Sequence, residues 1–230
     1  MAQILQVPET HSTNDDILRL SREGAEEGLW LRAERQTRGR GRQGRSWQSA
    51  PGNLYASTLI RLRPHDPPAP TLALVAGVAL HEVVASLAAS PELRLKWPND
   101  LMLAGAKLGG ILLEREGEAV VIGFGLNIAH HPADLKRPVT SLAAVGVAVD
   151  PATVAGILTE SLARWIARWR SDGLAPIRAR WLAAAHPPGT ALATSEGKGL
   201  FDGLDESGAL MLRLADGNVR VIHAGDVFLI

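Results

Sequence analysis

Short apolar runs, separated by polar, glycine-rich or proline-rich segments, dominate the first part of the chain. Apolar runs bounded by turn residues are typical of strands. They predict strands at residues 4–7, 29–33, 54–62, 93–96 and 120–128, and a hairpin formed by residues 101–103 and 107–114. The run at 54–62 is rich in residues that favour strands, which indicates a buried position in a sheet.

Three further segments have helical character. Residues 71–90 are apolar and alanine-rich, which predicts a core helix. Residues 152–170 and 174–185 predict two more helices. The apolar stripe of the first of these consists of Ile157, Leu162, Trp165, Ile166 and Trp169. We interpret its tryptophans as core residues rather than as a platform on which a ligand stacks.

The pattern changes after residues 186–189, His-Pro-Pro-Gly, which are typical of a linker. Beyond them, short alternating runs are separated by hairpin turns at residues 196–197, 205–208 and 216–218. This pattern predicts a small β-barrel. The sequence therefore predicts a larger domain at residues 1–186, which mixes helices and strands, and a C-terminal barrel at residues 187–230.

Composition narrows the function classes. The 24 Lys and Arg residues balance 24 Asp and Glu residues, so the formal net charge is zero and a globally basic nucleic-acid binder is disfavoured. The absence of cysteine excludes disulfides, thiolate metal sites and a cysteine nucleophile. We find neither a signal-peptide pattern nor an apolar run of about 18 residues. The sequence predicts a cytoplasmic protein that does not enter a membrane.

Against this neutral background, residues 36–47 concentrate positive charge. Four arginines, Arg38, Arg40, Arg42 and Arg45, are interleaved with Gly39, Gly41 and Gly44. Glycine lets a backbone adopt positive φ and approach a ligand closely, and each guanidinium offers a planar fork of donors to phosphate or carboxylate. The segment lies between two predicted strands, so we interpret it as a loop that folds over an anion. A disordered nucleic-acid-binding tract would be longer and repetitive.

Other polar positions extend this hypothesis. Ser12, Thr13 and Asn14 precede two acids and an apolar stretch, which is a helix N-terminus pattern. They either cap that helix alone or also hydrogen-bond a polar ligand. Residues 96–100, Lys-Trp-Pro-Asn-Asp, end in good turn chemistry. Residues 109–110 and the strand that ends at Asn127 contain glycines, which weaken strands unless another group packs against the backbone.

Four motifs in this order resemble the biotin protein ligases, that is, the biotin–[acetyl-CoA-carboxylase] ligases. They are Gly-Arg-Gly-Arg-Gln-Gly-Arg-Ser-Trp at 39–47, Lys-Trp-Pro-Asn-Asp at 96–100, Lys-Leu-Gly-Gly-Ile-Leu at 107–112 and Gly-Phe-Gly-Leu-Asn at 123–127. The resemblance runs from residue 12 into the C-terminal domain. His11 stands where the family more often has an acid, and Gln43 where arginine is common.

The resemblance implies an α/β catalytic domain with a mixed sheet, followed by an SH3-like barrel. It also implies a two-step reaction: biotin and MgATP form biotinyl-5′-adenylate, and a lysine of a biotin carboxyl carrier protein then takes the biotinyl group. By motif position, it places biotin at Ser12, Thr13, Asn14, Gln36, Arg40, Gly41, Arg42 and Lys107. It places ATP at Arg42, Arg45, Trp47, Lys96, Asn99, Asp100, Lys107 and Asn127. Lys107, Arg42 and Arg45 are the catalytic residues it implies, and it assigns no metal ligands.

Many members of this family carry an N-terminal helix-turn-helix, for which there is no room before Ser12, so we expect no specific DNA binding. The resemblance is compatible with a homodimer. Two alternatives stay open at this point. A lipoate or octanoyl protein ligase shares the fold and the adenylate chemistry, and a non-catalytic RNA-binding module could use the arginine–glycine loop.

Overall fold

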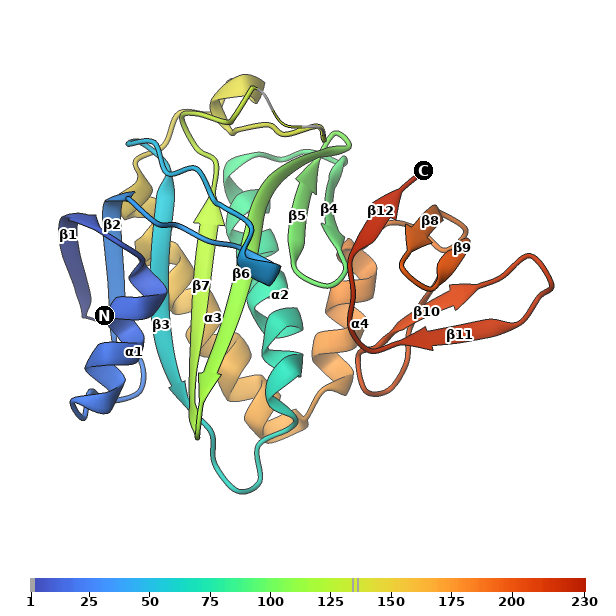
Figure 1. Ribbon diagram of the computed structural model, residues 1–230, viewed down its shortest axis with the longest axis horizontal. Coiled ribbons are helices and arrows are strands. Elements are labelled where there is room, and N and C mark those ends of the chain that lie inside the picture. The colour runs from blue at the N-terminus through green and yellow to red at the C-terminus, as the bar shows by residue number, and fades with distance from the viewer. Residues whose placement is uncertain (1–2, 134, 136) are drawn as a thin grey trace.

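The computed structural model describes residues 3–133, 135 and 137–230, and its larger part is built on a seven-stranded mixed sheet (Figure 1). The strand order is β1-β2-β3-β7-β6-β5-β4, with β1 and β2 parallel and the other pairs antiparallel. The strands are β1 (Ile4–Thr10), β2 (Trp30–Gln36), β3 (Leu54–Arg61), β4 (Leu93–Lys96), β5 (Asp100–Leu103), β6 (Ala106–Glu116) and β7 (Ala119–Leu126). The predicted strands and the mixed sheet are thus confirmed.

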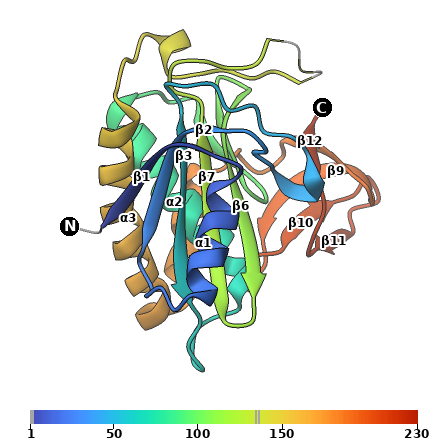
Figure 2. The same cartoon turned by 60° about the vertical axis from the view of Figure 1, so that its left-hand side comes forward.

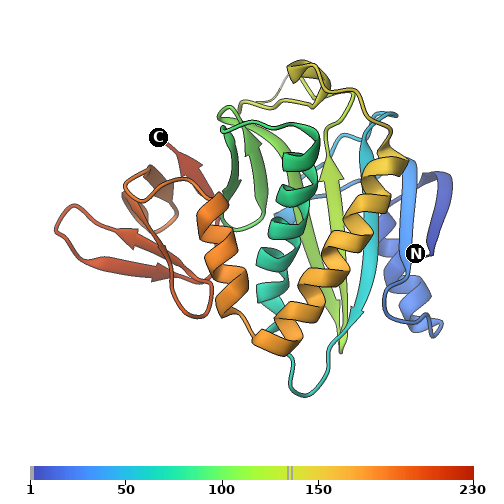
Figure 3. The ribbon, with the colours of Figure 1, turned by 180° about the vertical axis from the view of Figure 1, so that it is seen from behind.

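Helices cover both faces of this sheet. Helix α1 (Thr13–Arg22) lies on one face, and α2 (Leu72–Leu87), α3 (Pro151–Asp172) and α4 (Ala175–Ala184) lie on the other (Figures 1 and 3). Because β3 is covered on both sides, seven of its eight residues are buried. A small apolar cluster around Ile17 and Leu59 fixes α1, and a much larger one fixes α2 and α3.

The core helix α2 accounts for the most apolar stretch of the chain. Residues Ala69–Leu87 are long and apolar enough to cross a membrane, but 67% of the most apolar window is buried inside the protein. Next to it, Trp165 and Trp169 of α3 are buried and donate from Nε1 to Glu82 Oε2 and Thr71 Oγ1, each at 2.8 Å. They are core residues, as predicted. Ile157 is 38% exposed instead, because it lies at the margin of the buried stripe.

The C-terminal strands form a second sheet, with the order β11-β10-β9-β8-β12, beside β4 and α4 (Figure 3). Its strands are β8 (Ala191–Thr194), β9 (Gly197–Leu204), β10 (Leu210–Arg213), β11 (Val219–Ile222) and β12 (Val227–Leu229). All its pairs are antiparallel, and over the described residues no ladder joins the edge strands β11 and β12. Apolar residues of this sheet, including Phe201 and Leu212, continue the main core.

Candidate active site

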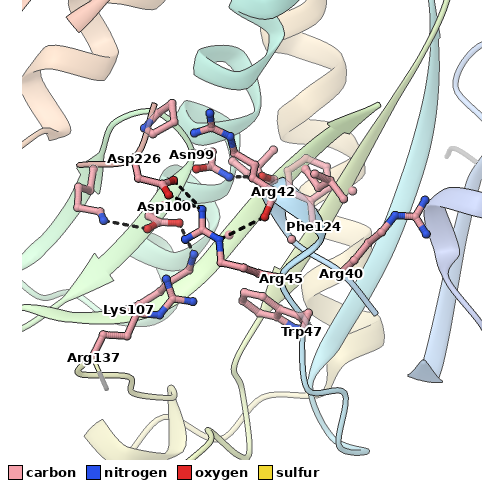
Figure 4. A pocket seen from close by; sticks show the side chains of 18 of the residues that line it. Arg40, Arg42, Arg45, Trp47, Asn99, Asp100, Lys107, Phe124, Arg137 and Asp226 are labelled. Atoms are coloured by element: carbon pink, nitrogen blue, oxygen red, sulfur yellow. Dashed lines mark hydrogen bonds and ion pairs between the residues drawn. The ribbon is translucent and has the colours of Figure 1, made fainter. Parts of the chain in front are cut away.

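One cavity brings together most of the predicted site residues (Figure 4). It lies where β2, β6 and β7 meet the segment before α1, the arginine loop (residues 38–47) and the start of β12. The predicted residues that line it are Ser12, Thr13, Asn14, Gln36, Arg40, Gly41, Arg42, Arg45, Trp47, Lys96, Asn99, Asp100 and Lys107. Segments far apart in sequence therefore contribute to a single site.

The first end of this cavity is lined by uncharged polar groups. Gln36, the last residue of β2, accepts a hydrogen bond at Oε1 from Thr13 N at 2.9 Å and lies 3.1 Å from the Thr13 hydroxyl. Ser12 occupies the N-cap position of α1, but its side chain makes no capping hydrogen bond. It is buried and lines the cavity. Side-chain capping therefore does not account for Ser12, and ligand binding stays a prediction for this segment.

Two glycines of β7 make room for site side chains. A Cβ at Gly123 would overlap the Asn14 side-chain amide, and one at Gly125 would lie 2.6 Å from the Trp47 ring. Gly110 of β6, paired with Gly125, also lies against Trp47. The predicted close packing on these glycine-bearing strands is therefore confirmed. The Trp47 Nε1 hydrogen is buried without an acceptor among the described residues.

The arginine loop reaches across the cavity to the C-terminal sheet. Arg45 Nη2 lies 2.6 Å from Asp226 Oδ1, and Arg42 Nη1 donates to the Gly225 carbonyl at 3.1 Å. Figure 2 shows the short turn at Arg42–Gly44 beside β12. Of the loop glycines, Gly44 adopts a positive φ of 70°. Gly39 is required for a different reason, since a Cβ there would lie 2.8 Å from the Trp47 carbonyl.

Arg40 points away from the other loop arginines (Figure 4). Its guanidinium pairs with Asp15 of α1 and with Glu114 of β6. The hydrogen bond to Asp15, together with Glu114, holds the pKa of Arg40 above its usual value, and the same hydrogen bond lowers the pKa of Asp15. Arg40 thus anchors the start of the loop to α1 and β6, while Arg45 joins its end to the residue that precedes β12.

A buried group of charges lies under the loop. Asp100 pairs with Lys107 and, at 3.0 Å, with Lys96 Nζ. Burial alone would raise the pKa of Asp100, but the two lysines outweigh it and hold that pKa below the usual value. Burial lowers the pKa of Lys107 despite Asp100, and Arg137 adds to this effect. Lys107 Nζ also lies 5.5 Å from the Trp47 ring centroid, within reach of a cation–π interaction.

The cavity lining is strongly positive although the chain is neutral. Six cationic residues line it, Arg40, Arg42, Arg45, Lys96, Lys107 and Arg137, against two carboxylates, Asp100 and Asp226. Such an excess of cations in a partly closed site favours a ligand with several negative charges. The cationic part of the cavity therefore suits a polyphosphate, and its uncharged polar part suits a neutral polar group.

Asn127 does not line this cavity, unlike the other predicted site residues. It is buried and its Nδ2 donates to the Thr140 carbonyl at 3.0 Å, which fixes the segment after β7. Sequence reasoning missed Arg137 and Asp226, which line the cavity, and Ser57, which hydrogen-bonds to Thr13 and Asn14 behind it. Ser57 had a local signal, since it is a polar residue within the apolar run of β3. Arg137 and Asp226 lie in segments without a comparable pattern.

The described residues contain no group of three or more His, Cys, Asp or Glu residues placed to hold a metal ion. Asp100 is the buried carboxylate of the cavity, and each of its oxygens already pairs with a lysine. It therefore does not fit the role of a magnesium ligand in this arrangement. Mg²⁺ is usually held by substrate phosphates with one or two carboxylates, so phosphate would have to supply most of the ligands here.

Comparisons with known proteins agree with the resemblance. Residues 6–127 match the Biotin/lipoate A/B protein ligase family, and residues 194–230 match the Biotin protein ligase C terminal domain. A biotin–[acetyl-CoA-carboxylase] ligase of Paracoccus denitrificans is 41% identical over 95% of this chain and 97% of its own length. The ligase of that name from Mycobacterium tuberculosis is 37% identical over 98% and 88%.

Solved structures give the same result. The biotin protein ligase of Aquifex aeolicus, in complex with biotin and ATP, superimposes with a TM-score of 0.88 at 26% identity. The match covers 100% of this chain and 99% of that one. It includes both the mixed sheet and the C-terminal sheet. The chain therefore belongs to the Biotin/lipoate A/B protein ligase family, and its C-terminal segment is that of the biotin protein ligases.

Proposed function

We propose that this protein is a biotin–[acetyl-CoA-carboxylase] ligase that uses ATP to attach biotin to a lysine of a biotin carboxyl carrier protein. In the first step, a biotin carboxylate oxygen attacks the α-phosphorus of ATP, and pyrophosphate leaves as the bond to the β-phosphate breaks. In the second step, the ε-amine of the carrier lysine attacks the acyl carbon of the biotinyl-5′-adenylate formed in the first step. AMP leaves and the amine loses a proton.

The observation that carries this proposal is the division of one cavity into an uncharged polar end and a cationic end. A ureido group has two donors and one strong acceptor, and Ser12, Thr13, Asn14 and Gln36 supply the hydroxyl and amide groups that match it. The carboxylate of biotin then extends toward Lys107. We infer that Arg40, Gly41 and Arg42 cover the bound biotin.

The cationic end suits the chemistry of the first step. Biotin carboxylate and ATP repel each other, so cations must lie between them. We infer that Lys107, Arg42 and Arg45 have this role, and that each is worth roughly 3–4 kcal/mol in the transition state. Trp47, Lys96, Asn99 and Asp100 lie at the same end and are proposed to hold the nucleotide. No protein nucleophile is required, so catalysis rests on positioning and electrostatics.

Asn127 does not line the cavity, and one hydrogen of its Nδ2 is donated to the Thr140 carbonyl, so its contact with the nucleotide stays a prediction from the sequence. Mg²⁺ is proposed to arrive with ATP and to stay on its phosphates. The cytoplasmic location, a homodimer and the lack of specific DNA binding stay predictions from the sequence.

One incubation tests the proposal. The protein is mixed with biotin, MgATP and a biotin carboxyl carrier domain, and the carrier is weighed by mass spectrometry. We expect a biotinyl adduct on one lysine and pyrophosphate release that depends on biotin. Stabilisation by lipoate with ATP, and none by biotin, would instead indicate a lipoate ligase. Salt-sensitive RNA binding without pyrophosphate release would indicate the RNA-binding alternative.

A further inference from the structure

Glu114 of β6 connects the arginine loop with the polar end of the cavity. Its carboxylate accepts a hydrogen bond from Asn14 Nδ2 at 2.7 Å. It also accepts from Arg40 Nη2, which lies 2.9 Å from Oε1 and 3.0 Å from Oε2. Glu114 stands 100 positions from Asn14 and 74 from Arg40 in the sequence, so only the fold brings the three together.

We propose that Glu114 is a positioning residue for biotin: it fixes the orientation of the Asn14 amide and so determines which hydrogen bonds this end of the cavity offers. The inference rests on the proposed function, because it concerns the ureido group of biotin. It assigns Glu114 no contact with the reacting atoms. Glu114 acts through Asn14 on one side and through Arg40 on the other.

The orientation of Asn14 follows from the chemistry of its neighbours. An ionised carboxylate only accepts hydrogen bonds, whereas a side-chain amide donates at one end and accepts at the other. Glu114 therefore selects the orientation in which Asn14 Nδ2 faces it and Oδ1 faces away. Packing then holds this orientation, because Asn14 is 3% exposed and lies directly against Gly123.

This choice extends to Ser57 and Thr13. Ser57 Oγ lies 2.6 Å from Asn14 Oδ1 and 2.7 Å from Thr13 Oγ1. Since Oδ1 can only accept, Ser57 must give it the single hydroxyl hydrogen that it carries. Ser57 then has no hydrogen left for Thr13 Oγ1, whose own single hydrogen is within reach of both Ser57 Oγ and Gln36 Oε1. The Glu114 carboxylate thus sets the direction of the hydrogen bonds through Asn14 and Ser57.

One hydrogen of the Asn14 amide remains free for a ligand. Asn14 Nδ2 carries two hydrogens, of which Glu114 takes one, and the described residues provide no acceptor for the second. Asn14 lines the cavity, so this hydrogen can be donated to a carbonyl oxygen such as that of a urea. If Asn14 were turned over, an acceptor would face this carbonyl instead.

The test compares Glu114→Gln with Glu116→Gln. Glu116 lies two residues further along β6, pairs with the surface residue Arg22 and does not line the cavity, so it is a matched control. Biotin affinity is measured by calorimetry without ATP, and KM is measured for biotin and for ATP. We expect Glu114→Gln to weaken biotin binding about tenfold, as for the loss of one buried hydrogen bond. KM for ATP should stay within about twofold, and Glu116→Gln should resemble the wild type.

A second probe separates positioning from general damage. In 2-iminobiotin an imino group replaces the ureido oxygen, so the analogue presents a donor where biotin presents an acceptor. We expect the wild type to prefer biotin, and Glu114→Gln to lose part of this preference. An unchanged preference, or equal losses for biotin and ATP, would overturn the inference alone. A wild-type protein that binds no biotin would overturn the proposed function, and this inference with it.

Discussion

Arg45 of the arginine loop and Asp226 at the start of β12 form an ion pair, with Arg45 Nη2 2.6 and 2.8 Å from the two carboxylate oxygens. The two residues are 181 positions apart: Arg45 lies in the loop between β2 and β3, and Asp226 directly precedes β12. The pair therefore ties the loop that covers the cavity to the C-terminal domain. We expect this connection to matter more for retention of the adenylate than for folding.

Asp226→Asn tests this expectation. Both side chains are partly exposed, at 43% and 28%, so the pair contributes roughly 0–1 kcal/mol. Adenylate should escape up to about fivefold faster, and the loop should be cleaved more readily by protease. Escape is measured by chase of labelled adenylate. Asp202→Asn is the control, because its pair with Arg213 has similar exposure but does not line the cavity. Equal effects of both changes would contradict the prediction.

Lys107→Ala should lower the rate of the first step, adenylate formation. Loss of one preorganised cation costs roughly 3–4 kcal/mol, which corresponds to a rate about 10²–10³-fold lower. The measurement is pyrophosphate release that depends on biotin, and the protein should remain folded by circular dichroism. Lys107→Arg, which keeps the charge, should lose less. Normal release from Lys107→Ala would move the electrostatic role to another residue.

The first step should also weaken at alkaline pH. Burial lowers the pKa of Lys107 below its usual value of 10.5, so the charged form is lost at a lower pH than for an ordinary lysine. Rates should therefore fall as pH rises through this lowered pKa. This fall is measured as the pH profile of the rate of adenylate formation. Lys107→Arg is the comparison, since arginine stays charged over the whole pH range. An alkaline limb that persists unchanged in Lys107→Arg would mean that another group causes it.

Arg42→Ala should leave the fold intact but slow adenylate formation or let the adenylate escape. Arg42 lines the cavity, and the only hydrogen bond that its side chain makes among the described contacts is to the Gly225 carbonyl. Loss of an interaction made in the transition state would cost roughly 3–4 kcal/mol. Arg38→Ala is the control, since Arg38 is exposed and outside the cavity lining. Normal formation and retention in Arg42→Ala would contradict the role assigned to the loop.

Gly125→Ala should displace Trp47, because the added Cβ would lie 2.6 Å from the ring. We expect a loss of about 1–3 kcal/mol in stability, as for other overpacked sites, and weaker ATP binding. Thermal unfolding and a titration with ATP measure both. Gly156→Ala on α3 has open space around the new Cβ and should instead gain roughly 0.5–1 kcal/mol. An unchanged ATP affinity in Gly125→Ala would mean that Trp47 does not contribute to nucleotide binding.

The sequence was most informative where local patterns decide the structure. Apolar runs predicted every strand of the large sheet, because residues buried on both faces, as in β3, leave a continuous apolar signal. The interleaved arginines and glycines marked the loop, and the glycines of β7 marked a close approach that proved to involve Asn14 and Trp47. These signals lie within a few residues of one another.

The sequence was least informative where distant residues meet. Nothing near Asp226 or Glu114 indicates that they pair with Arg45 and Arg40, since each contact depends on the completed fold. For the same reason the sequence did not indicate that Asn127 donates to the Thr140 carbonyl and lies outside the cavity lining. A motif identifies the type of residue at a position, but only the packing of the folded chain determines which neighbour that residue contacts.

The last residues of the chain form part of the cavity wall, which has a practical consequence for handling the protein. Phe228 and Leu229 line the cavity, and Ile230 is 64% exposed beside them. A purification tag or fluorescent fusion attached at Ile230 would therefore lie next to the cavity. Strand β1 lies at the opposite edge of the large sheet (Figure 1), so fusions are better placed at the start of the chain.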